Sequence, residues 1–332
     1  MKQKKFNPFK KFLAPETQIV KHGKWYAIAP LAIIAIGLLV VLIFNFNLGL
    51  DFTGGQIIKI DGINRQQEAE VRAVVREVLR NEENLSRGAA NRAFFQREDG
   101  DFTYALTARY PNPRGNDNEI HETNTRIRLA VERELGTQQL VFISVEPAAS
   151  LSASASTERL MNVFIAVFAA LIGILLYMLF RFKFTSGVAA IIGLFHDVLI
   201  MLACVAIFQI QINFVFVAAV ITVVAYSLNN SIVLLDRVRD KERDVSNTQS
   251  IAQKVDSSIK ETFWRTTITT VTTLVPIIIL TIFGVPLIQE FALPIIFGLL
   301  AGTYSTICIT SSLYVRFENA KVAKAKLKKK NA

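Results

Sequence analysis

The sequence contains few of the residues on which redox, metal and disulfide chemistry depend. Among 332 residues there are two cysteines, Cys204 and Cys308, and both fall inside long apolar runs, so no disulfide framework is expected. The three histidines, His22, His121 and His196, lie far apart in the chain. Neither a GxxxxGKS/T phosphate loop nor an HExxH zinc pair occurs. These absences argue against a nucleotide hydrolase or a zinc hydrolase, and we expect no cofactor and no enzymatic reaction.

Apolar residues, by contrast, make up 52% of the chain, and its mean hydropathy of +0.37 is too high for an ordinary soluble protein. A membrane-crossing helix needs roughly 20 mostly apolar residues. We therefore expect a membrane α-helical fold with six transmembrane helices. The fifth helix is the weakest because it is rich in threonine, although a threonine hydroxyl can bond back to its own helix and be tolerated in lipid. The predicted spans are 27–47, 159–180, 187–208, 214–235, 266–284 and 289–315.

The net charge of +10 is concentrated beside these spans, which favours a membrane over nucleic acid as the partner of the basic residues. Residues 1–26 and 316–332 are rich in lysine and arginine, whereas the short connections 209–213 and 285–290 contain neither. By the positive-inside rule both termini and the connection 236–265 are expected in the cytoplasm. A basic leader before an apolar run is also typical of a cleaved signal peptide, but this run is too long and no small-residue cleavage pattern follows it.

A soluble domain is expected between the first two spans, over residues 48–158, where the polarity is ordinary and charges of both signs alternate. Periodicity predicts strands near 56–60, 92–96, 102–108 and 139–145, with helices whose apolar faces fall within 71–78 and 120–135. The order β-α-β-β-α-β is the ferredoxin-like α+β pattern. Two interpretations of Arg87, Arg92 and Arg97 stay open, a patch for acidic partners and an ordinary solvated face.

The residues after the first span read LGLDFTGG (48–55), which resembles the signature that follows the first span of SecD and SecF proteins. Within it, Gly54 and Gly55 can adopt backbone angles closed to other residues, and Asp51, followed by Phe52, can cap the turn. Four further segments resemble SecF segments in the same order: FHDVLI (195–200), YSLNNSIVLLDRVRD (226–240), RTTITTVTTL (265–274) and FALPIIFGLLAGTYS (291–305).

The resemblance implies an accessory subunit of the Sec protein translocase in the bacterial plasma (inner) membrane. Its implied partners are SecD and the SecYEG translocon, with YajC as a further candidate and exported preproteins as the transported chains. Members of this family are related to half of an RND-type exporter and use the proton- or sodium-motive force. Two alternatives stay open: half of an RND-like small-molecule exporter, and an assembly scaffold that couples to no ion.

Polar residues inside the predicted spans are the candidates for ion coupling, because ionisable groups are costly in lipid and mark functional paths. Tyr226, Asn230 and Arg237 fall on one stripe of the fourth span and predict a polar line towards its cytoplasmic end. Simpler interpretations also exist: Asp236 and Arg237 fit a charge pair at the membrane surface, and His196 fits a satisfied core histidine. The full set of candidates is Asp197, Asn229, Asn230, Ser231, Asp236, Arg237 and Arg265.

The resemblance implies an aspartate at the position of Asn230, and an amide cannot carry a proton. Three explanations stay open. SecD holds the titrating acid while this chain supplies a polar relay, or Asp197 has taken over the role, or the subunit is sodium-linked or uncoupled, since amide and hydroxyl oxygens bind hard cations. In the last span, Gly298 and Gly302 lie four residues apart and predict a small-residue face for close helix packing.

The expected topology is tested by cysteine labelling in intact cells. A cysteine at Asn112, in an Asn112→Cys variant, should react with a membrane-impermeant maleimide because residues 48–158 are predicted outside the cytoplasm. A Lys324→Cys variant is the matched control and should react only after the cells are opened. Protection of the residue-112 cysteine in intact cells would reject the topology.

Overall fold

The computed structural model of the chain describes residues 17–53, 56–63, 68–81, 94–99, 104–110, 117–135, 153–244, 246, 248–284 and 286–330. The described residues belong to two compact units. A helical unit contains the residues through Phe46, then Phe168–Ile210, then those from Val215 onwards. A mixed unit contains Asn47–Val167 and the short segment Gln211–Phe214.

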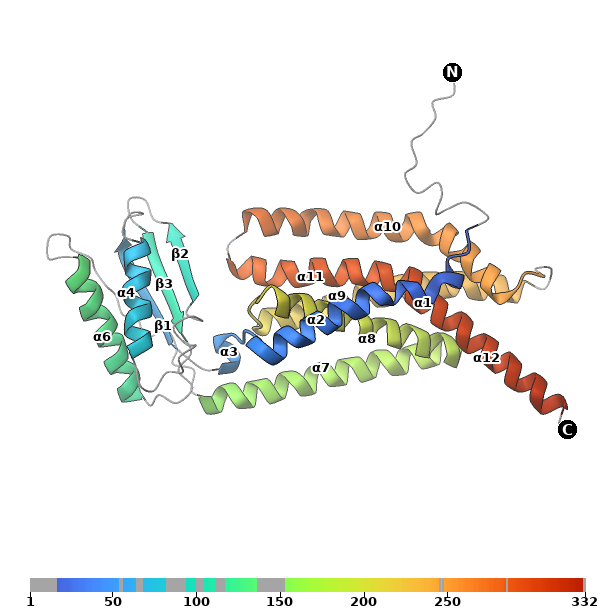
Figure 1. Cartoon of the computed structure of the whole chain (residues 1–332), viewed down its shortest axis with the longest axis horizontal. Helices are drawn as coiled ribbons and strands as arrows, with labels where there is room; N and C mark the ends of the chain where they lie inside the picture. The colour runs from blue at the N-terminus through green and yellow to red at the C-terminus, as the bar shows by residue number, and fades with distance from the viewer. Residues whose placement is uncertain are drawn as a thin grey trace, which may run out of the picture. The chain divides into compact units, whose positions relative to one another are not determined.

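Long helices build the helical unit, and most of them run antiparallel to their neighbours in sequence (Figure 1). The helix α2 packs on α8, α8 packs on α11, and α11 packs on α10. The elements are η1 (Val20–His22), α1 (Gly23–Tyr26), α2 (Ile28–Phe44), α7 (Ala153–Arg181), α8 (Phe184–Ile207), α9 (Phe214–Arg243), α10 (Ile251–Phe283), α11 (Pro286–Ser305), η2 (Thr306–Thr310) and α12 (Ser311–Lys330).

Five helical segments among the described residues are long and apolar enough to cross a membrane. They are α7, α8, α9, α10 and the continuous stretch Ile288–Leu327, which runs through α11, η2 and α12. The helix α2 is also apolar but has 17 residues, somewhat fewer than the usual span. The chain is therefore a membrane α-helical protein, as the composition predicts.

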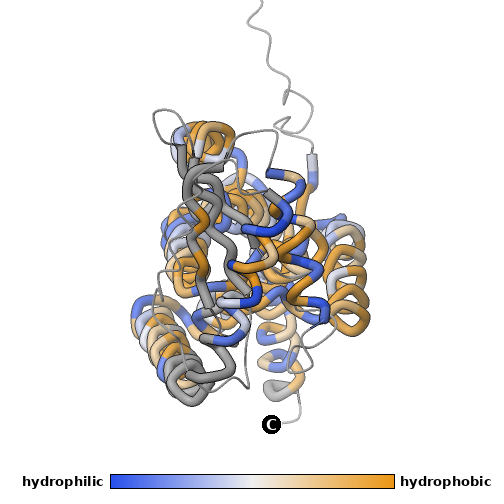
Figure 2. Tube along the Cα trace, turned by 90° about the vertical axis from the view of Figure 1, so that its left-hand side faces the viewer, coloured by the Kyte–Doolittle hydropathy of each residue, from blue (hydrophilic) through white to orange (hydrophobic). Residues whose placement is uncertain are grey.

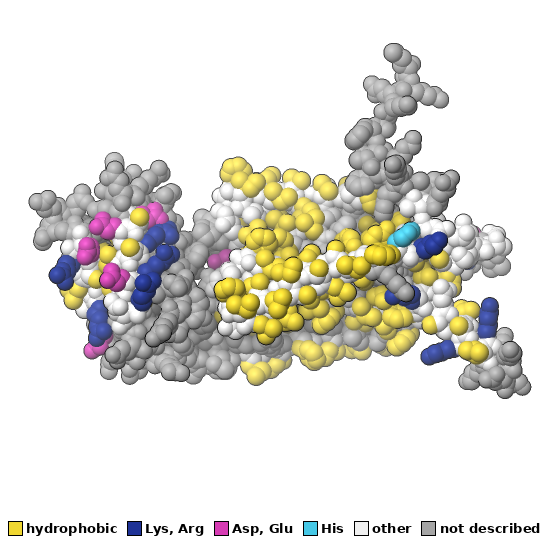
Figure 3. Space-filling model, viewed as in Figure 1, with side chains coloured by type: hydrophobic (Ala, Val, Ile, Leu, Met, Phe, Trp, Pro, Cys, Tyr) yellow, Lys and Arg dark blue, Asp and Glu magenta, His cyan; other side chains and the backbone are white. Residues whose placement is uncertain are grey.

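These helices are largely hydrophobic along their length, as the orange stretches of the trace in Figure 2 show, and many of their apolar side chains are exposed. Leu42 of α2 is 72% exposed and Phe180 of α7 is 92% exposed. The face of the helical unit seen in Figure 3 is largely hydrophobic, and its Lys, Arg and His side chains gather at the end that carries α12. Such a surface would be an aggregation liability in water, whereas acyl chains solvate it without penalty.

Close backbone approach at small residues holds the helices together, which is the usual way that helices associate in lipid. A Cβ added at Gly37 of α2 would lie 2.4 Å from the Cβ of Ala203 on α8, so only glycine fits there. At the end that carries α1 and α12, a cluster of buried side chains fills the interior: Ile19, Met178, Leu234, Val238, Ile259 and Tyr314.

The last membrane helix is interrupted by the π-helical segment η2. Thr306 and Thr310 of η2 are 1% and 0% exposed, so hydroxyl groups are buried at the level of the π turn. Immediately after it, the Ser312 hydroxyl donates to the carbonyl of Cys308, four residues earlier, at 2.7 Å. Single π turns inside α-helices are rare and occur frequently at functional sites.

Most of the predicted connection 236–265 is helical. Helix α9 continues to Arg243, and α10 begins at Ile251 with a capping box between Ser250 and Gln253, so only 244–250 connect them. Beyond their apolar segments the two helices are held together by Glu261 of α10, which accepts from both Arg237 and Lys241 of α9, at 2.5 and 2.6 Å.

The first turn of the connection is closed by a short polar contact. The hydroxyl and the backbone N–H of Ser246 donate to the Asp244 carboxylate at 2.5 and 3.0 Å, and these bonds hold the pKa of Asp244 below its usual range.

The predicted basic tail, 316–332, is helical in α12 as far as Lys330. Charged residues favour helix here because straight-chain lysines have good helix propensity.

The mixed unit contains a three-stranded antiparallel sheet covered by two helices (Figure 1). Its elements are α3 (Leu50–Thr53), β1 (Gln56–Ile63), α4 (Glu68–Asn81), β2 (Phe94–Asp99), β3 (Tyr104–Tyr110) and α6 (Asp117–Leu135). The strand order is β1-β3-β2, with Ile58 opposite Ala108 and Phe95 opposite the same residue from the other side. The connection from β1 through α4 to β2 therefore passes over β3, the split β-α-β arrangement.

The buried face of α4 follows the predicted helical spacing. Val71, Val75 and Leu79 are at most 1% exposed, and Val131 of α6 is equally buried. Within the described residues β2 covers Phe94–Asp99 and continues past the predicted end at residue 96, to the pairing of Asp99 with Tyr104. The predicted strand 139–145 lies outside the described residues, as do Arg87 and Arg92.

Candidate functional site

Asp197 of α8 lies at the centre of a buried polar cluster where three helices meet. Its side chain is 1% exposed. The carboxylate oxygen Oδ2 accepts hydrogen bonds from the hydroxyls of Ser227 on α9 and Ser305 on α11, the latter at 2.8 Å. The other oxygen, Oδ1, lies 2.9 Å from Nδ1 of His196. Both oxygens of a carboxylate buried in the bundle are thus satisfied by named partners.

His196 gives this cluster a position where a proton can be gained. Its side chain is 12% exposed, and its second ring nitrogen, Nε2, is buried without a hydrogen-bond partner in the described residues. If Nδ1 carries the hydrogen and donates it to Asp197, the Nε2 lone pair is free. A proton bound at Nε2 would then lie on a ring already held by the Asp197 carboxylate.

The π segment supplies a second buried polar atom beside the pair. The Thr310 hydroxyl has no hydrogen-bond partner in the described part of the helical unit. A Cβ added at Gly193, one turn before His196 on α8, would lie 2.2 Å from this hydroxyl oxygen. Glycine at 193 therefore lets η2 approach α8 closely next to His196. Unsatisfied buried polar groups are costly, and in native structures they frequently mark functional sites.

The two glycines of the last span position the donor from α11. A Cβ added at Gly298 would lie 2.3 Å from the Cγ2 of Val223, and one at Gly302 would lie 3.1 Å from the Cβ of Ser227. Both contacts are with α9 of this same chain. Because Ser305 follows Gly302 by one turn on the same face, close packing of α11 on α9 brings its hydroxyl within reach of Asp197.

The tripeptide 229–231 on α9 divides between two environments. Asn229 is exposed, whereas Asn230 and Ser231 are 4% and 1% exposed and share the buried face with Ser227. The Ser231 hydroxyl lies 3.3 Å from the hydroxyl of Thr306 in η2. The structure therefore gathers Asn230, Ser231 and Asp197 in the interior of the bundle and leaves Asn229 out of it.

The other polar residues of the predicted stripe make separate contacts. The Tyr226 hydroxyl bonds to that of Thr273 on α10, while Arg237 pairs with Glu261 at 2.5 Å near the helix ends. Asp236 pairs instead with Arg181 of α7 at 3.3 Å, with both side chains partly exposed. These last two pairs fit the simpler interpretation of charges at a membrane surface, where ion pairs contribute little.

Arg265 lies on an exposed face of α10 and has no acidic partner among the described residues. Its carbonyl accepts the hydroxyl of Thr269 at 3.0 Å, and Thr270 bonds back to Thr266 at 2.9 Å. The threonines of the fifth span thus return their hydroxyls to the helix backbone as expected. The Thr270 hydroxyl also lies 2.9 Å from that of Thr303 on α11.

The signature after the first span meets the start of α9. Within the mixed unit, the Asp51 carboxylate accepts the backbone N–H of Phe214, the first residue of α9, at 3.1 Å. The rings of Phe52 and Phe214 stack edge to face with centroids 5.1 Å apart, and the Gly49 N–H donates to the carbonyl of Ile212 at 2.7 Å. A carboxylate at a helix N-terminus satisfies a free N–H and complements the helix dipole.

Parts of this geometry escape sequence analysis. Asp51 was expected to cap a local turn, but its partner lies 163 positions away. Gly54 and Gly55 lie outside the described residues. Sequence analysis places Ser305 only on the small-residue packing face of the last span and does not identify Ser227 or Thr310, although small hydroxyl residues at helical spacing in an apolar run are an available signal. Among the described residues no three His, Cys, Asp or Glu side chains gather as metal ligands.

Comparison with known proteins identifies relatives along almost the whole chain. The family model described as protein export membrane protein SecD/SecF, C-terminal, matches residues 135–320. The protein translocase subunit SecF of Sebaldella termitidis is 27% identical over 308 residues, which cover 90% of this chain and 91% of that protein. The subunit SecDF of Thermus thermophilus is 31% identical over 317 residues, which cover 93% of this chain and 40% of that protein.

A solved structure gives the same result. The crystal structure of SecDF from Thermus thermophilus, a translocon-associated membrane protein, matches with a TM-score of 0.71 at 29% identity. The match covers 92% of this chain and 39% of the SecDF chain. This chain therefore spans about two-fifths of those longer SecDF proteins.

Removal of the Asp51 cap should destabilise the start of α9. We expect Asp51→Ala to lower the free energy of unfolding by about 0.5–2 kcal/mol, the usual effect of losing an N-terminal cap. Asp51→Asn keeps an acceptor oxygen and should lose much less. Thermal unfolding of the purified full chain, with hydrogen exchange at the Phe214 amide, measures both effects. Equal exchange at Phe214 in all three proteins would show that the cap contributes nothing.

Proposed function

We infer the function from the premise that the chain belongs to the SecD/SecF family of protein export membrane proteins. It is a SecF-type subunit of the protein translocase, a multi-pass membrane protein of the transport class. Beyond this, we propose that it acts with SecD and the SecYEG translocon in the bacterial inner membrane, with YajC as a further candidate partner. The relatives in which SecD and SecF are one chain support association with a SecD partner.

We propose further that the subunit promotes preprotein translocation or release by using an ion-motive force, with the proton as the coupling ion. The single observation that supports this is the buried pair of His196 and Asp197, with an imidazole nitrogen left unpaired in the bundle interior. Ionisable residues buried at membrane depth are rare, and their default interpretation is functional. One charge moved through 100 mV yields about 2.3 kcal/mol, enough to bias a helix junction.

The proposed proton site is His196 Nε2, with Asp197 as the group that holds the ring and stabilises the imidazolium. Protonation would add one positive charge where α8, α9 and α11 meet, and the adjacent η2 is the irregular backbone that can adjust to it. The amide of Asn230 cannot bind and release a proton, so in this chain Asn230 would serve as a buried polar neighbour of the site and not as the proton carrier.

The outer region belongs to the same proposal. We propose that residues 48–158 form a ferredoxin-like domain outside the cytoplasm and that both termini are cytoplasmic. The order β1-β3-β2 with helices after β1 and β3 supports this, since a fourth strand beside β1 would complete the pattern. The basic residues of α12 and of the turn between α7 and α8 support a cytoplasmic location of these segments.

His196→Gln should strongly reduce proton-driven stimulation of export. The assay is preprotein translocation into inverted vesicles that contain this chain and its SecD partner, with an imposed proton or sodium gradient. We expect stimulation by the proton gradient to fall at least about fivefold, the lower range of coupling between linked sites.

His22→Gln is the matched control, because the His22 side chain is exposed and its Nδ1 lies 3.1 Å from the carbonyl oxygen of Gln18, away from the Asp197 cluster. It should leave stimulation unchanged. In the same vesicles, Asn230→Asp should be tolerated or should raise proton coupling, because a carboxylate at this position can carry a proton whereas the amide cannot. If His196→Gln keeps full proton stimulation, or if only sodium stimulates export, the His196 proposal is wrong.

Arg265→Ala should reduce export while the protein still inserts into the membrane. The exposed guanidinium without an acidic partner among the described residues fits a group that meets a charge or a substrate outside this chain. Export activity per inserted protein is the measurement, and Arg265→Lys, which keeps the charge, is expected to retain part of it. Unchanged export in the alanine variant would argue against a coupling role.

A further inference from the structure

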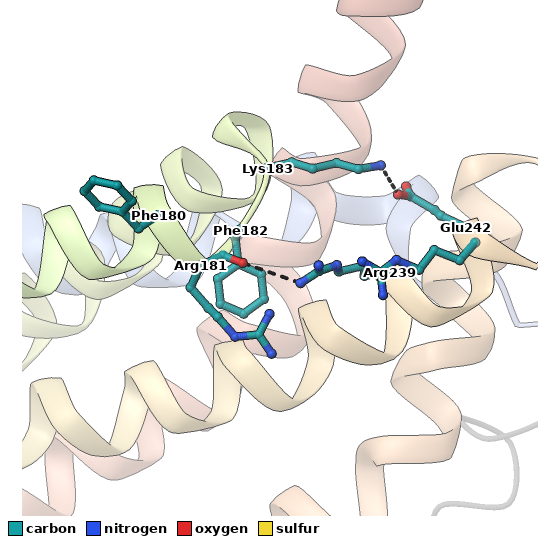
Figure 4. Close-up of a pocket in the computed structure, with 7 residues that line it drawn as sticks. Phe180, Arg181, Phe182, Lys183, Arg239 and Glu242 are labelled. Carbon is teal, nitrogen blue, oxygen red and sulfur yellow. Dashed lines mark hydrogen bonds and ion pairs between the residues drawn. The ribbon is translucent and has the colours of Figure 1, made fainter.

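A cavity of about 360 Å³ opens between the turn that joins α7 to α8 and the last turns of α9 (Figure 4). Residues 180–183 form one wall, and Arg239, Glu242 and Arg243 form the other. The volume lies within the roughly 300–1,000 Å³ of ordinary ligand pockets. None of these residues takes part in the cluster around Asp197.

Positive charge exceeds negative charge in this cavity. Its one carboxylate, Glu242, pairs with the Lys183 ammonium at 2.5 Å and also accepts the hydroxyl of Tyr314. Arg181 pairs with Asp236, outside the lining. The lining therefore holds four cationic side chains and one anionic one: Arg181, Lys183, Arg239 and Arg243 against Glu242.

Two guanidinium groups of the lining have no counter-charge. Arg239 donates through Nη1 to the backbone carbonyl of Arg181 at 3.4 Å, as the dashed line in Figure 4 shows, and makes no ion pair in the described residues. Arg243 has no acidic partner there either and is exposed. The planar fork of arginine fits two oxygens of a phosphate at once. Both arginines are thus available to an anion that enters the cavity.

The cavity lies at the level where apolar helices end. Phe180, near the end of α7, is 92% exposed and Phe184, the first residue of α8, is 72% exposed, as expected of side chains that face acyl chains. The Arg181 guanidinium lies 5.2 Å from the ring centroid of Phe182, which is buried, so the turn between them is held in place. Basic residues directly beside lipid-facing phenylalanines are positioned for phosphate headgroups.

We propose that this cavity binds the headgroup phosphate of an anionic phospholipid. Arg239 and Arg243 would donate to the phosphate oxygens, while Phe180 and Phe184 face the acyl chains. The neighbouring apolar side chains favour a lipid over free phosphate, because a soluble anion gains nothing from them. The proposal is independent of ion coupling at His196.

The test uses the full chain in bilayer nanodiscs that contain phosphatidylcholine and a photoactivatable phosphatidylglycerol. Cross-linked peptides, identified by mass spectrometry, should map to the α7 to α8 turn and the end of α9. In the double variant Arg239→Gln/Arg243→Gln we expect labelling there to fall about thirtyfold, the scale for two basic residues at a membrane surface. A photoactivatable phosphatidylcholine should label the same peptides weakly.

The matched control removes the same charge elsewhere. Lys324→Gln/Lys326→Gln alters two exposed lysines of α12 and should leave labelling of the cavity within about twofold, since screening confines surface charges to short range. In Arg239→Lys/Arg243→Lys, which keeps the charge but loses the planar guanidinium groups, labelling of the cavity should lie between that of the unchanged protein and that of the glutamine double variant. Equal loss in the α12 control, labelling spread evenly over the helices, or competition by inorganic phosphate as effective as phosphatidylglycerol would each overturn the proposal. Thermal unfolding in phosphatidylcholine alone shows whether the variants remain folded.

Discussion

The burial of the Asp197 carboxylate is the constraint on which the arrangement of the bundle depends. A carboxylate removed from water costs several kcal/mol unless donors replace the lost hydration. Here the donors come from three different helices, His196 beside it, Ser227 on α9 and Ser305 on α11. The helices can therefore pack in few ways, because any arrangement that moves one of them leaves the carboxylate undersatisfied.

Close packing is what makes those hydrogen bonds short enough. In lipid there is no hydrophobic driving force between helices, so small residues at the contacts and buried hydroxyls take its place. Gly298 and Gly302 let α11 approach α9, and Gly193 lets η2 approach α8. The signature segment of the mixed unit contacts the N-terminus of α9, where the Asp51 carboxylate accepts the backbone N–H of Phe214.

The sequence alone predicts the spans, the family and the polar residues within the spans, but not which residues those polar side chains contact. Apolar runs predict the membrane helices because lipid permits little else, and the valine spacing of α4 predicts its buried face. Hydropathy does not show how far α9 and α10 extend beyond their apolar segments, because the ion pairs that join them there leave no hydropathy signal. The cluster of Asp197 with Ser227 and Ser305 joins residues up to 108 positions apart, so no local pattern contains it.

The π turn in the final helix has a consequence for register. An ordinary α-helix advances about 100° per residue, so the extra residue that a π turn accommodates rotates everything after Thr310 relative to everything before it. Ser305, before the turn, meets Asp197, whereas Tyr314, after it, meets Glu242. A straight helix of the same sequence would align one of these side chains and turn the other away. The irregular turn is therefore what allows one helix to serve two neighbours at different angles.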